Sequence, residues 1–377
     1  MSLQYDAVAL GMGAYTRAAF SVHTLGADVF SAEPGTIIFS THRRETDVPL
    51  LCPSMYRAGR LWASRPRISF AAREDVFVRG FFAGFPRNLS PRARKALYGI
   101  GVGGALRYLP WMSPIRSATM IRLGDVLREV PAGALDKLLP RELAAVFRER
   151  ASSLGLPGPV HGADVLRGEY ADLLWRKVRR PDLAESPELE GLWSRQAALA
   201  GADFRRLVDV VRGGGTLMLF PEGRPSPDGR IGPVRPGLTA LVRRARPVRL
   251  QPVGIAYDPL VRGRTRAYVS FLPPVEPPTD ELEDAVLALM RLAMPLTCGQ
   301  VVARRLSEGE SAPRRLEDQL ARAVEEARAE GRNLDVNLAD PRVRHRRVAE
   351  AVEAAASRGR EVAYLAREHA AARGETL

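Results

Sequence analysis

The sequence TIIFS at residues 36–40 runs directly into THRRETD at residues 41–47. The β-branched and apolar residues Thr36, Ile37, Ile38 and Phe39, followed by Ser40, predict a short, fully buried strand. The polar residues that follow predict a loop at the carboxyl end of that strand. In open α/β sheets this is the edge at which ligands bind, so the loop is a candidate for function.

Similar short, apolar or β-branched patterns predict further strands, with helical patterns between them, at 68–72, 118–123, 216–220, 248–255 and 266–272. Strands that alternate with helices are typical of an α/β fold. We therefore expect a central, mostly parallel sheet flanked by helices.

The chain is expected to divide into a main domain and a helical extension. Pro273-Pro274 and Pro277-Pro278 indicate a linker, which places the main domain at 1–278 and a C-terminal helical extension at 279–377. A mostly polar, largely helical insertion is expected within the main domain at about 125–200. The apolar residues 5–30 predict a helix that lies on the main domain or at a membrane surface.

Composition excludes several classes of protein. With 377 residues, of which 46% are hydrophobic and 26% charged, the chain is long enough for one large domain or two ordinary ones. Its two cysteines, Cys52 and Cys298, are too few for a disulfide framework or a four-cysteine zinc site. No secretory pattern precedes them, so the cytoplasmic side is expected, and no metal site is predicted.

The formal net charge of +13 suits phosphates, anionic lipid or nucleic acid. Only three of the 56 basic residues are lysines, a bias that codon usage can also produce. Because the arginines are spread along the whole chain without a known recognition motif, no nucleic-acid partner is expected.

His42 and Asp47 are the first candidate site residues. At the start of a helix, an aspartate five positions after a histidine can face the imidazole. A carboxylate in that place fixes the tautomer of the ring and raises its basicity, as deprotonation of a hydroxyl requires. This spacing alone is common in proteins.

A second candidate segment is FPEGR at residues 220–224, again at the end of a predicted strand. Backbone amides of a glycine-containing loop, together with an arginine, can hold an anion. Two such loops at the carboxyl ends of strands in one sheet are expected to converge on one crevice.

These segments belong to four blocks whose order resembles that of the glycerolipid acyltransferase superfamily, which includes glycerol-3-phosphate and 1-acylglycerol-3-phosphate acyltransferases. His42 and Asp47 match the HxxxxD block, and Phe220-Pro221-Glu222-Gly223 matches the FPEG block. Met120-Ile121-Arg122 resembles the second block and Gln251-Pro252-Val253-Gly254-Ile255 the fourth. The resemblance covers roughly residues 36–256.

The resemblance implies a glycerol-phosphate acyltransferase-like fold and transfer of a fatty acyl group from coenzyme A or acyl carrier protein to a lysophospholipid. The first expected acceptor is 1-acylglycerol 3-phosphate, which gives phosphatidate. His42 is expected to act as general base and Asp47 to orient it, with no cofactor. Substrate binding is expected at Arg43, Arg122, Glu222, Gly223 and Arg224.

Two departures from the family pattern leave the acceptor open. Thr41 stands where the family usually has Asn, and Arg224-Pro225-Ser226 stands where it commonly has Thr-Arg-Ser. Glycerol 3-phosphate or another lysolipid is therefore an alternative acceptor. The sequence is also compatible with a hydrolytic relative and with a catalytically silent, basic lipid- or nucleic-acid-binding protein.

Phe81, Phe82 and Phe85 cluster beside arginines, which suits either a membrane interface or core packing. We expect a peripheral protein on the inner face of the cell membrane. Cys52 lies among apolar residues and is expected to be inert. The spacing of Gly99, Gly101 and Gly104 fits a dinucleotide fingerprint but follows no strand, so no nucleotide site is expected there.

Overall fold

A computed structural model describes residues 2–31, 33–58, 68–78, 80, 83, 90–99, 111–183 and 187–375. The chain forms two compact units. Met1–Ser69 and Val208–Leu377 make up the first, and Phe70–Leu207 makes up the second. Strand β3 and helix α10 each run across the division between them.

A mixed, mostly parallel sheet is the centre of the fold. In the described part of the chain it has seven strands, in the order β1-β9-β8-β2-β7-β3-β4. β8 and β9 pair antiparallel, while β1 with β9, β2 with β7 and β8, and β3 with β4 pair parallel. The expected α/β fold class is confirmed. The strands are β1 (Ser21–Leu25), β2 (Thr36–Ser40), β3 (Ile68–Arg73), β4 (Met112–Ile115), β7 (Thr216–Leu219), β8 (Arg249–Asp258) and β9 (Arg266–Phe271).

Most predicted strands are present close to their expected bounds, and β2 spans the predicted residues, all five of them buried. The N-terminal segment differs from the prediction of one long helix. Helix α1 (Ser2–Ala19) ends early, and β1 follows as an edge strand paired with β9. Pairing along a sheet edge depends on the distant partner strand, so it overrides the local apolar pattern.

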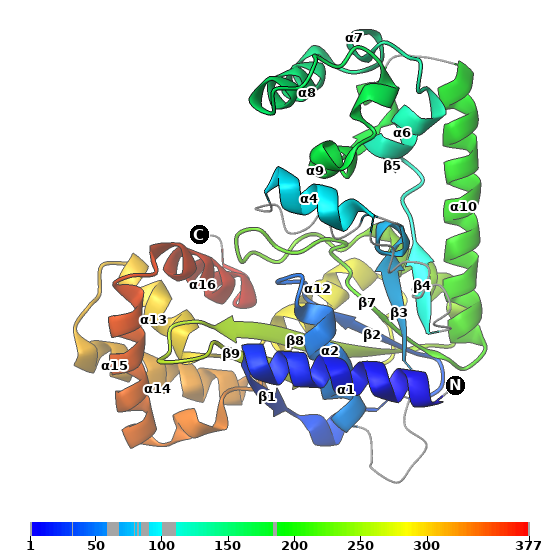
Figure 1. Cartoon of the computed structure of the whole chain (residues 1–377). Helices are drawn as coiled ribbons and strands as arrows, with labels where there is room; N and C mark the ends of the chain where they lie inside the picture. Colours follow the sequence, from blue (N-terminus) through cyan, green and yellow to red (C-terminus); the bar gives the residue numbers. More distant parts are fainter. Residues whose placement is uncertain are drawn as a thin grey trace. The chain divides into compact units, whose positions relative to one another are not determined.

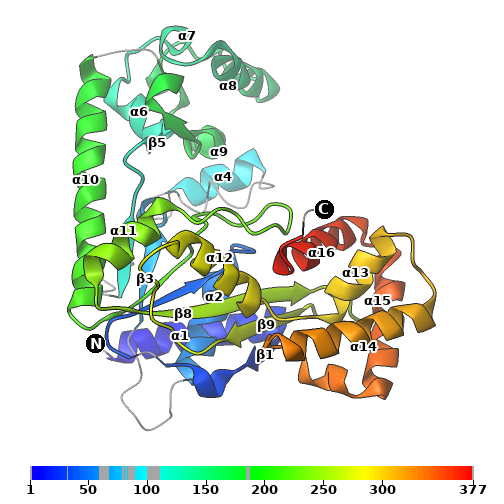
Figure 2. The ribbon, with the colours of Figure 1, turned by 180° about the vertical axis from the view of Figure 1, so that it is seen from behind.

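Helices cover both faces of the sheet in the first unit. Figure 1 shows α1 and α2 (Asp47–Ala58) in front of it, and Figure 2 shows α11 (Pro236–Ala245) and α12 (Leu282–Ala293) on the opposite face. This layering buries both sides of β2 and β8, as in other sheets with parallel strands. The first residue of α2 is Asp47, which therefore stands at the edge where β2 ends.

The C-terminal helices form a bundle with its own apolar core within the first unit. The bundle also contacts the end of β8, where the buried Asp258 accepts hydrogen bonds from Arg347 Nη2 and Gly299 N, both 3.1 Å away. The boundary expected at residue 278 stays a prediction. The helices are α13 (Cys298–Ser307), α14 (Pro313–Ala329), α15 (Pro341–Ala355) and α16 (Gly359–Ala372).

The second unit has a core of its own, which includes Leu123, Leu127, Phe147 and Tyr170. It holds a short antiparallel pair, β5 (Met120–Arg122) and β6 (Lys177–Arg179), among helices. Residues 125–200 lie within this unit and are largely helical, and their expected nature as an insertion stays a prediction. The helices are α4 (Pro91–Tyr98), α6 (Leu123–Glu129), α7 (Leu135–Leu138), α8 (Arg141–Ser153), α9 (Ala171–Leu174) and α10 (Pro187–Arg212).

Helices in the described ranges are either too short or too polar to cross a membrane. The predicted aromatic cluster of Phe81, Phe82 and Phe85 lies outside the described residues, as do Gly101 and Gly104.

Replacement of Gly254 by alanine is expected to destabilise the first unit. A Cβ atom at this position of β8 would lie 1.8 Å from the carbonyl oxygen of Ala293, at the end of α12. Because that contact is with backbone, helix and strand must separate. We expect Gly254→Ala to lower the free energy of unfolding, measured by urea denaturation, by about 1–3 kcal/mol or more.

Gly237→Ala is the matched control, since nothing lies within 4 Å of a Cβ atom at this position of α11. It is expected to leave stability unchanged or to raise it by up to about 1 kcal/mol, because alanine favours the helix. Equal stability of the two variants would show that α12 does not approach β8 so closely.

Candidate active site

The two polar loops predicted from the sequence meet at one edge of the sheet. β2 and β7 are parallel neighbours, with Phe39 opposite Leu219, so both strands end at this edge. His42 follows β2 and Glu222 follows β7. The backbone N–H of His42 donates a hydrogen bond to Glu222 Oε1 at 2.8 Å. The expected convergence of the loops is therefore present.

His42 and Asp47 are in direct contact. The distance from His42 Nδ1 to Asp47 Oδ2 is 2.8 Å, and Asp47 has no exposed surface. An ionised carboxylate only accepts hydrogen bonds, so Nδ1 carries the proton and Nε2 has a free lone pair. Nε2 has no partner among the described residues. The ring stacks on Phe220, with centroids 4.1 Å apart, which holds it in place.

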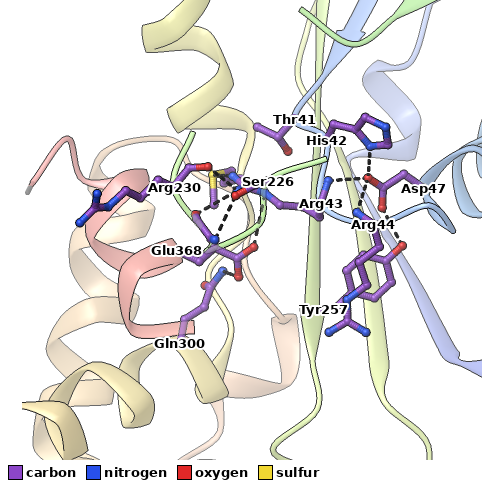
Figure 3. A network of polar contacts seen from close by, with 12 residues as sticks. Thr41, His42, Arg43, Arg44, Asp47, Ser226, Arg230, Tyr257, Gln300 and Glu368 are labelled. Carbon is purple, nitrogen blue, oxygen red and sulfur yellow. Dashed lines mark hydrogen bonds and ion pairs between the residues drawn. The ribbon is translucent and has the colours of Figure 1, made fainter. Parts of the chain in front are cut away.

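Further donors hold the Asp47 carboxylate, as Figure 3 shows. The backbone N–H groups of Arg43 and Arg44 donate to Oδ2, and the hydroxyl of Tyr257 donates to Oδ1 at 2.8 Å. Asp47 is also the first residue of α2, where the helix dipole favours a negative charge. These interactions offset the cost of burying the carboxylate.

Tyr257 was not predicted from the sequence, because the expected strand ended two residues earlier, at 255. β8 continues to Asp258 and is the parallel neighbour of β2. Burial, followed by the charge of Asp47, raises the pKa of Tyr257, so its hydroxyl stays protonated and donates. The position of Tyr257 near the end of a strand next to β2 was the available signal.

Glu222 links two loops through its carboxylate. Besides accepting from His42 N, it accepts a hydrogen bond at Oε2 from Gly232 N, at 2.7 Å. The side chain is buried, and burial raises its pKa, while the charge of Arg43 and the two amides oppose that rise. Glu222 therefore fixes the loop 221–235 against the end of β2. Its expected contact with substrate stays a prediction.

Gly223 and Arg224 are exposed at the turn after β7. Gly223 has φ +70°, and its N–H donates to Phe220 O at 3.0 Å, so glycine is favoured here. The Arg224 guanidinium has no hydrogen bond or ion pair with any described residue. It is therefore available to an anion, as expected from the sequence, although the contact itself stays a prediction.

Arg43 has a setting that the sequence did not predict. Its side chain is buried and points away from His42 toward α16 (Figure 3), where its Nε atom lies 3.4 Å from Glu368 Oε1. Nη1 donates to the carbonyl of Gly229 at 3.0 Å. Burial acts to lower the pKa of Arg43, but Glu368 raises it above its ordinary value. Arg43 connects the loop after β2 to the C-terminal helices, and substrate binding by it stays a prediction.

Arg122 lies in the second unit, at the end of β5. Its Nε and Nη2 atoms are each 2.7 Å from Asp125 Oδ2, and its guanidinium lies over the ring of Trp175 at 4.9 Å. Arg122 is thus paired within its own unit. Its expected role in phosphate binding stays a prediction.

The fourth block of the resemblance forms part of β8. The buried side chain of Gln251 donates to the carbonyls of Val29 and Leu272 and accepts from Ser31 N. These bonds tie β8 to the segment after β1 and to the residue after β9. The block therefore supports the sheet next to the site.

The buried Cys52 offers no alternative nucleophile at this site. Burial raises the pKa of the Cys52 thiol to about 12, so the reactive thiolate is not formed at neutral pH, in agreement with the expected inert role. In the described ranges, no three His, Cys, Asp or Glu residues are grouped so that they could hold a metal ion.

Comparisons with solved structures include a remote similarity. The crystal structure of the 1-acyl-sn-glycerophosphate (LPA) acyltransferase PlsC from Thermotoga maritima matches 76% of this chain and 77% of its own, with 13% sequence identity and a TM-score of 0.35. A similarity this remote carries no argument about activity. No family model matches the chain, and no curated protein matches its sequence.

The pair of Arg43 and Glu368 is expected to contribute strongly to stability. We expect Arg43→Met and Glu368→Leu each to lower the free energy of unfolding by about 3–5 kcal/mol, because each leaves an uncompensated buried charge. The double variant is expected to lose clearly less than the two losses added together. Urea denaturation of all four proteins measures this coupling.

Arg262→Gln serves as the control, because Arg262 and its partner Glu353 are largely exposed. Solvent screens such a pair, so stability is expected to stay unchanged. Simple additivity of the losses at Arg43 and Glu368 would contradict a direct interaction between them.

Proposed function

We propose that the protein transfers an acyl group from a thioester to the hydroxyl of a lysophospholipid, with His42 as general base. The observation that carries this proposal is the contact of His42 Nδ1 with the buried Asp47, which leaves Nε2 free. The four sequence blocks in family order support the choice of reaction. The contact and the first of these blocks both involve His42 and Asp47.

The expected mechanism is direct transfer. His42 Nε2 takes the proton of the acceptor hydroxyl while the hydroxyl oxygen bonds to the thioester carbonyl carbon. The tetrahedral intermediate then collapses, the carbon–sulfur bond breaks, and the thiolate leaves with its electron pair. The imidazolium returns its proton to the thiolate. Asp47 stabilises the imidazolium and holds the reactive tautomer, as carboxylates do in catalytic triads.

We propose 1-acylglycerol 3-phosphate as acceptor, which gives phosphatidate. Arg224, exposed and unpaired within the described ranges, supports a phosphate-bearing acceptor, and Arg122 is the second candidate for that contact. Glycerol 3-phosphate and another lysolipid are the alternative acceptors. Acyl-coenzyme A or acyl carrier protein is the proposed donor, and the mechanism requires no separate cofactor.

His42→Ala and Asp47→Asn are expected to lower kcat/KM by about 10²–10⁴-fold, because general-base catalysis is lost or the tautomer is changed. The assay follows thiol release from acyl-coenzyme A with 1-acylglycerol 3-phosphate, with glycerol 3-phosphate or without acceptor, and resolves the lipid products.

His345→Ala is the control, since this exposed histidine pairs with Glu317 in the C-terminal helices and should be dispensable for turnover. Near wild-type turnover of folded His42→Ala would refute the proposed base. Thiol release without a lipid product would indicate a hydrolase instead.

We also propose that helix α1 attaches the protein to anionic lipid on the inner face of the cell membrane. Leu3, Leu10 and Tyr15 on this helix are 80%, 64% and 53% exposed. Arg17 follows on the same helix, and Arg57 reaches it from α2, with Nη2 lying against Gly13. Exposed apolar side chains beside arginines are the combination that inserts at a lipid interface.

Replacement of Leu3 and Leu10 by serine is expected to weaken co-sedimentation with phosphatidylglycerol-containing vesicles by at least about tenfold, because each buried leucine contributes roughly 1.5–3 kcal/mol. Val336→Ser is the control, as Val336 is 70% exposed at a distance in sequence from α1. Unchanged sedimentation of the double variant would exclude α1 as the attachment site.

A further inference from the structure

A polar cavity of about 360 Å³ lies among the C-terminal helices α13, α14 and α16. Its walls include Arg304, Arg305, Arg322 and Arg373, together with His369 and two glutamates, and we call it the basic cavity. Its volume falls in the range of roughly 300–1,000 Å³ that is usual for small-molecule sites. None of these residues takes part in the proposed acyl transfer.

Several buried polar atoms of the basic cavity have no hydrogen-bond partner in the part of the chain that the structure describes. They are Arg304 Nη1, Arg305 Nε and His369 Nδ1. Nε of the neighbouring Arg332 is also buried without a hydrogen-bond partner among the described residues. His369 itself is more than nine-tenths buried. A buried donor without an acceptor costs about 1–3 kcal/mol, so several in one place indicate that an acceptor is missing.

The carboxylates nearby do not satisfy these atoms. Glu326 and Glu375 accept from Arg373, at 2.6 and 2.9 Å, and Glu308 binds Nε of Arg304 and Nη1 of Arg305. Glu375 also lies 3.6 Å from Nη2 of Arg304. These pairs use other nitrogens of the arginines and leave the orphaned ones unpaired.

Arg322 is exposed and adds a positive charge without an ionic partner among the described residues. It lies on α14, and no described residue makes an ion pair or hydrogen bond with its guanidinium. Three glutamates, Glu308, Glu326 and Glu375, pair with the other arginines of the wall, so Arg322 is the arginine left over.

The environment of His369 indicates a positive potential in the cavity. Burial, followed by the charges of Arg373, Arg332, Arg304 and Arg305, lowers the pKa of His369 to about 3. The imidazole is therefore neutral at physiological pH and has one N–H group to donate. A group of donors in a positive field calls for a ligand with negatively charged acceptor atoms.

We propose that the basic cavity binds a phosphate group carried by a small molecule or lipid headgroup. Phosphate oxygens accept hydrogen bonds from several arginines at once, and the negative charge of a phosphate matches the unpaired Arg322. The site goes beyond the proposed acyl transfer and does not depend on it. Glu368, next to His369 on α16, pairs with Arg43, so a ligand here contacts the helix that also supports the active-site loop.

The first test is calorimetric titration of the full chain with pyrophosphate at fixed ionic strength. We expect one saturable site and a loss of affinity of about tenfold or more in Arg322→Gln, since charge-assisted hydrogen bonds are strong. Arg322 has no partner among the described residues, so this variant is expected to fold. Arg304→Gln is a second variant, which removes an orphaned donor.

Arg346→Gln is the matched control, with the same change of charge at an exposed position of α15 and no effect expected. Equal weakening by Arg346→Gln and Arg322→Gln would show non-specific attraction and overturn the proposal. Absence of saturable binding to every phosphate probe would also overturn it, leaving water as the occupant.

Two further arms identify the source of the phosphate. Coenzyme A tests a soluble phosphate ester, and vesicles with phosphatidate, compared with phosphatidylcholine alone, test a lipid headgroup. Whichever probe binds must lose affinity in Arg322→Gln for the proposal to stand. His42→Ala is expected to bind the same probe as tightly as the wild type, which separates this site from acyl transfer.

Discussion

The buried carboxylate of Asp47 is the group around which the site is arranged, because a charge without exposed surface must have all its oxygens hydrogen-bonded. Its partners are the imidazole of His42, the backbone N–H groups of Arg43 and Arg44, and the hydroxyl of Tyr257. These groups come from the loop after β2 and from β8. Their hydrogen bonds to Asp47 together fix the path of the loop after β2, the tautomer of His42 and the start of α2.

Two other buried acids hold the loops that surround this arrangement. Glu222 joins the end of β2 to the loop after β7 through backbone amides, and Glu368 meets Arg43 from α16. Glu222 binds the backbone N–H of His42, Glu368 pairs with the side chain of Arg43, and neither has a hydrogen bond to the imidazole of His42. Glu222 and Arg43, two expected substrate-binding residues, thus have structural contacts of their own.

Much of this arrangement was predictable from local sequence. The strand at 36–40 is recognisable from its β-branched and apolar residues. Two residues at a strand-to-helix junction lie close together, which predicts the contact of His42 with Asp47. The partner of Arg43 was not predictable, since Glu368 lies in a segment rich in Arg, Glu and Ala where no local pattern distinguishes one glutamate from another. Strand β1 was missed because its pairing with β9 depends on a partner far along the chain.

The contact of Arg43 with Glu368 also bears on how the protein is made. Helix α16 follows every strand of the sheet in the chain, so a ribosome has produced the whole sheet before this helix emerges. Until then, the side chain of Arg43 lacks its counter-charge. The sheet and the contact of Arg43 with Glu368 are therefore completed at different moments of synthesis. A nascent chain can form the core around the sheet before α16, which carries Glu368, has been synthesised.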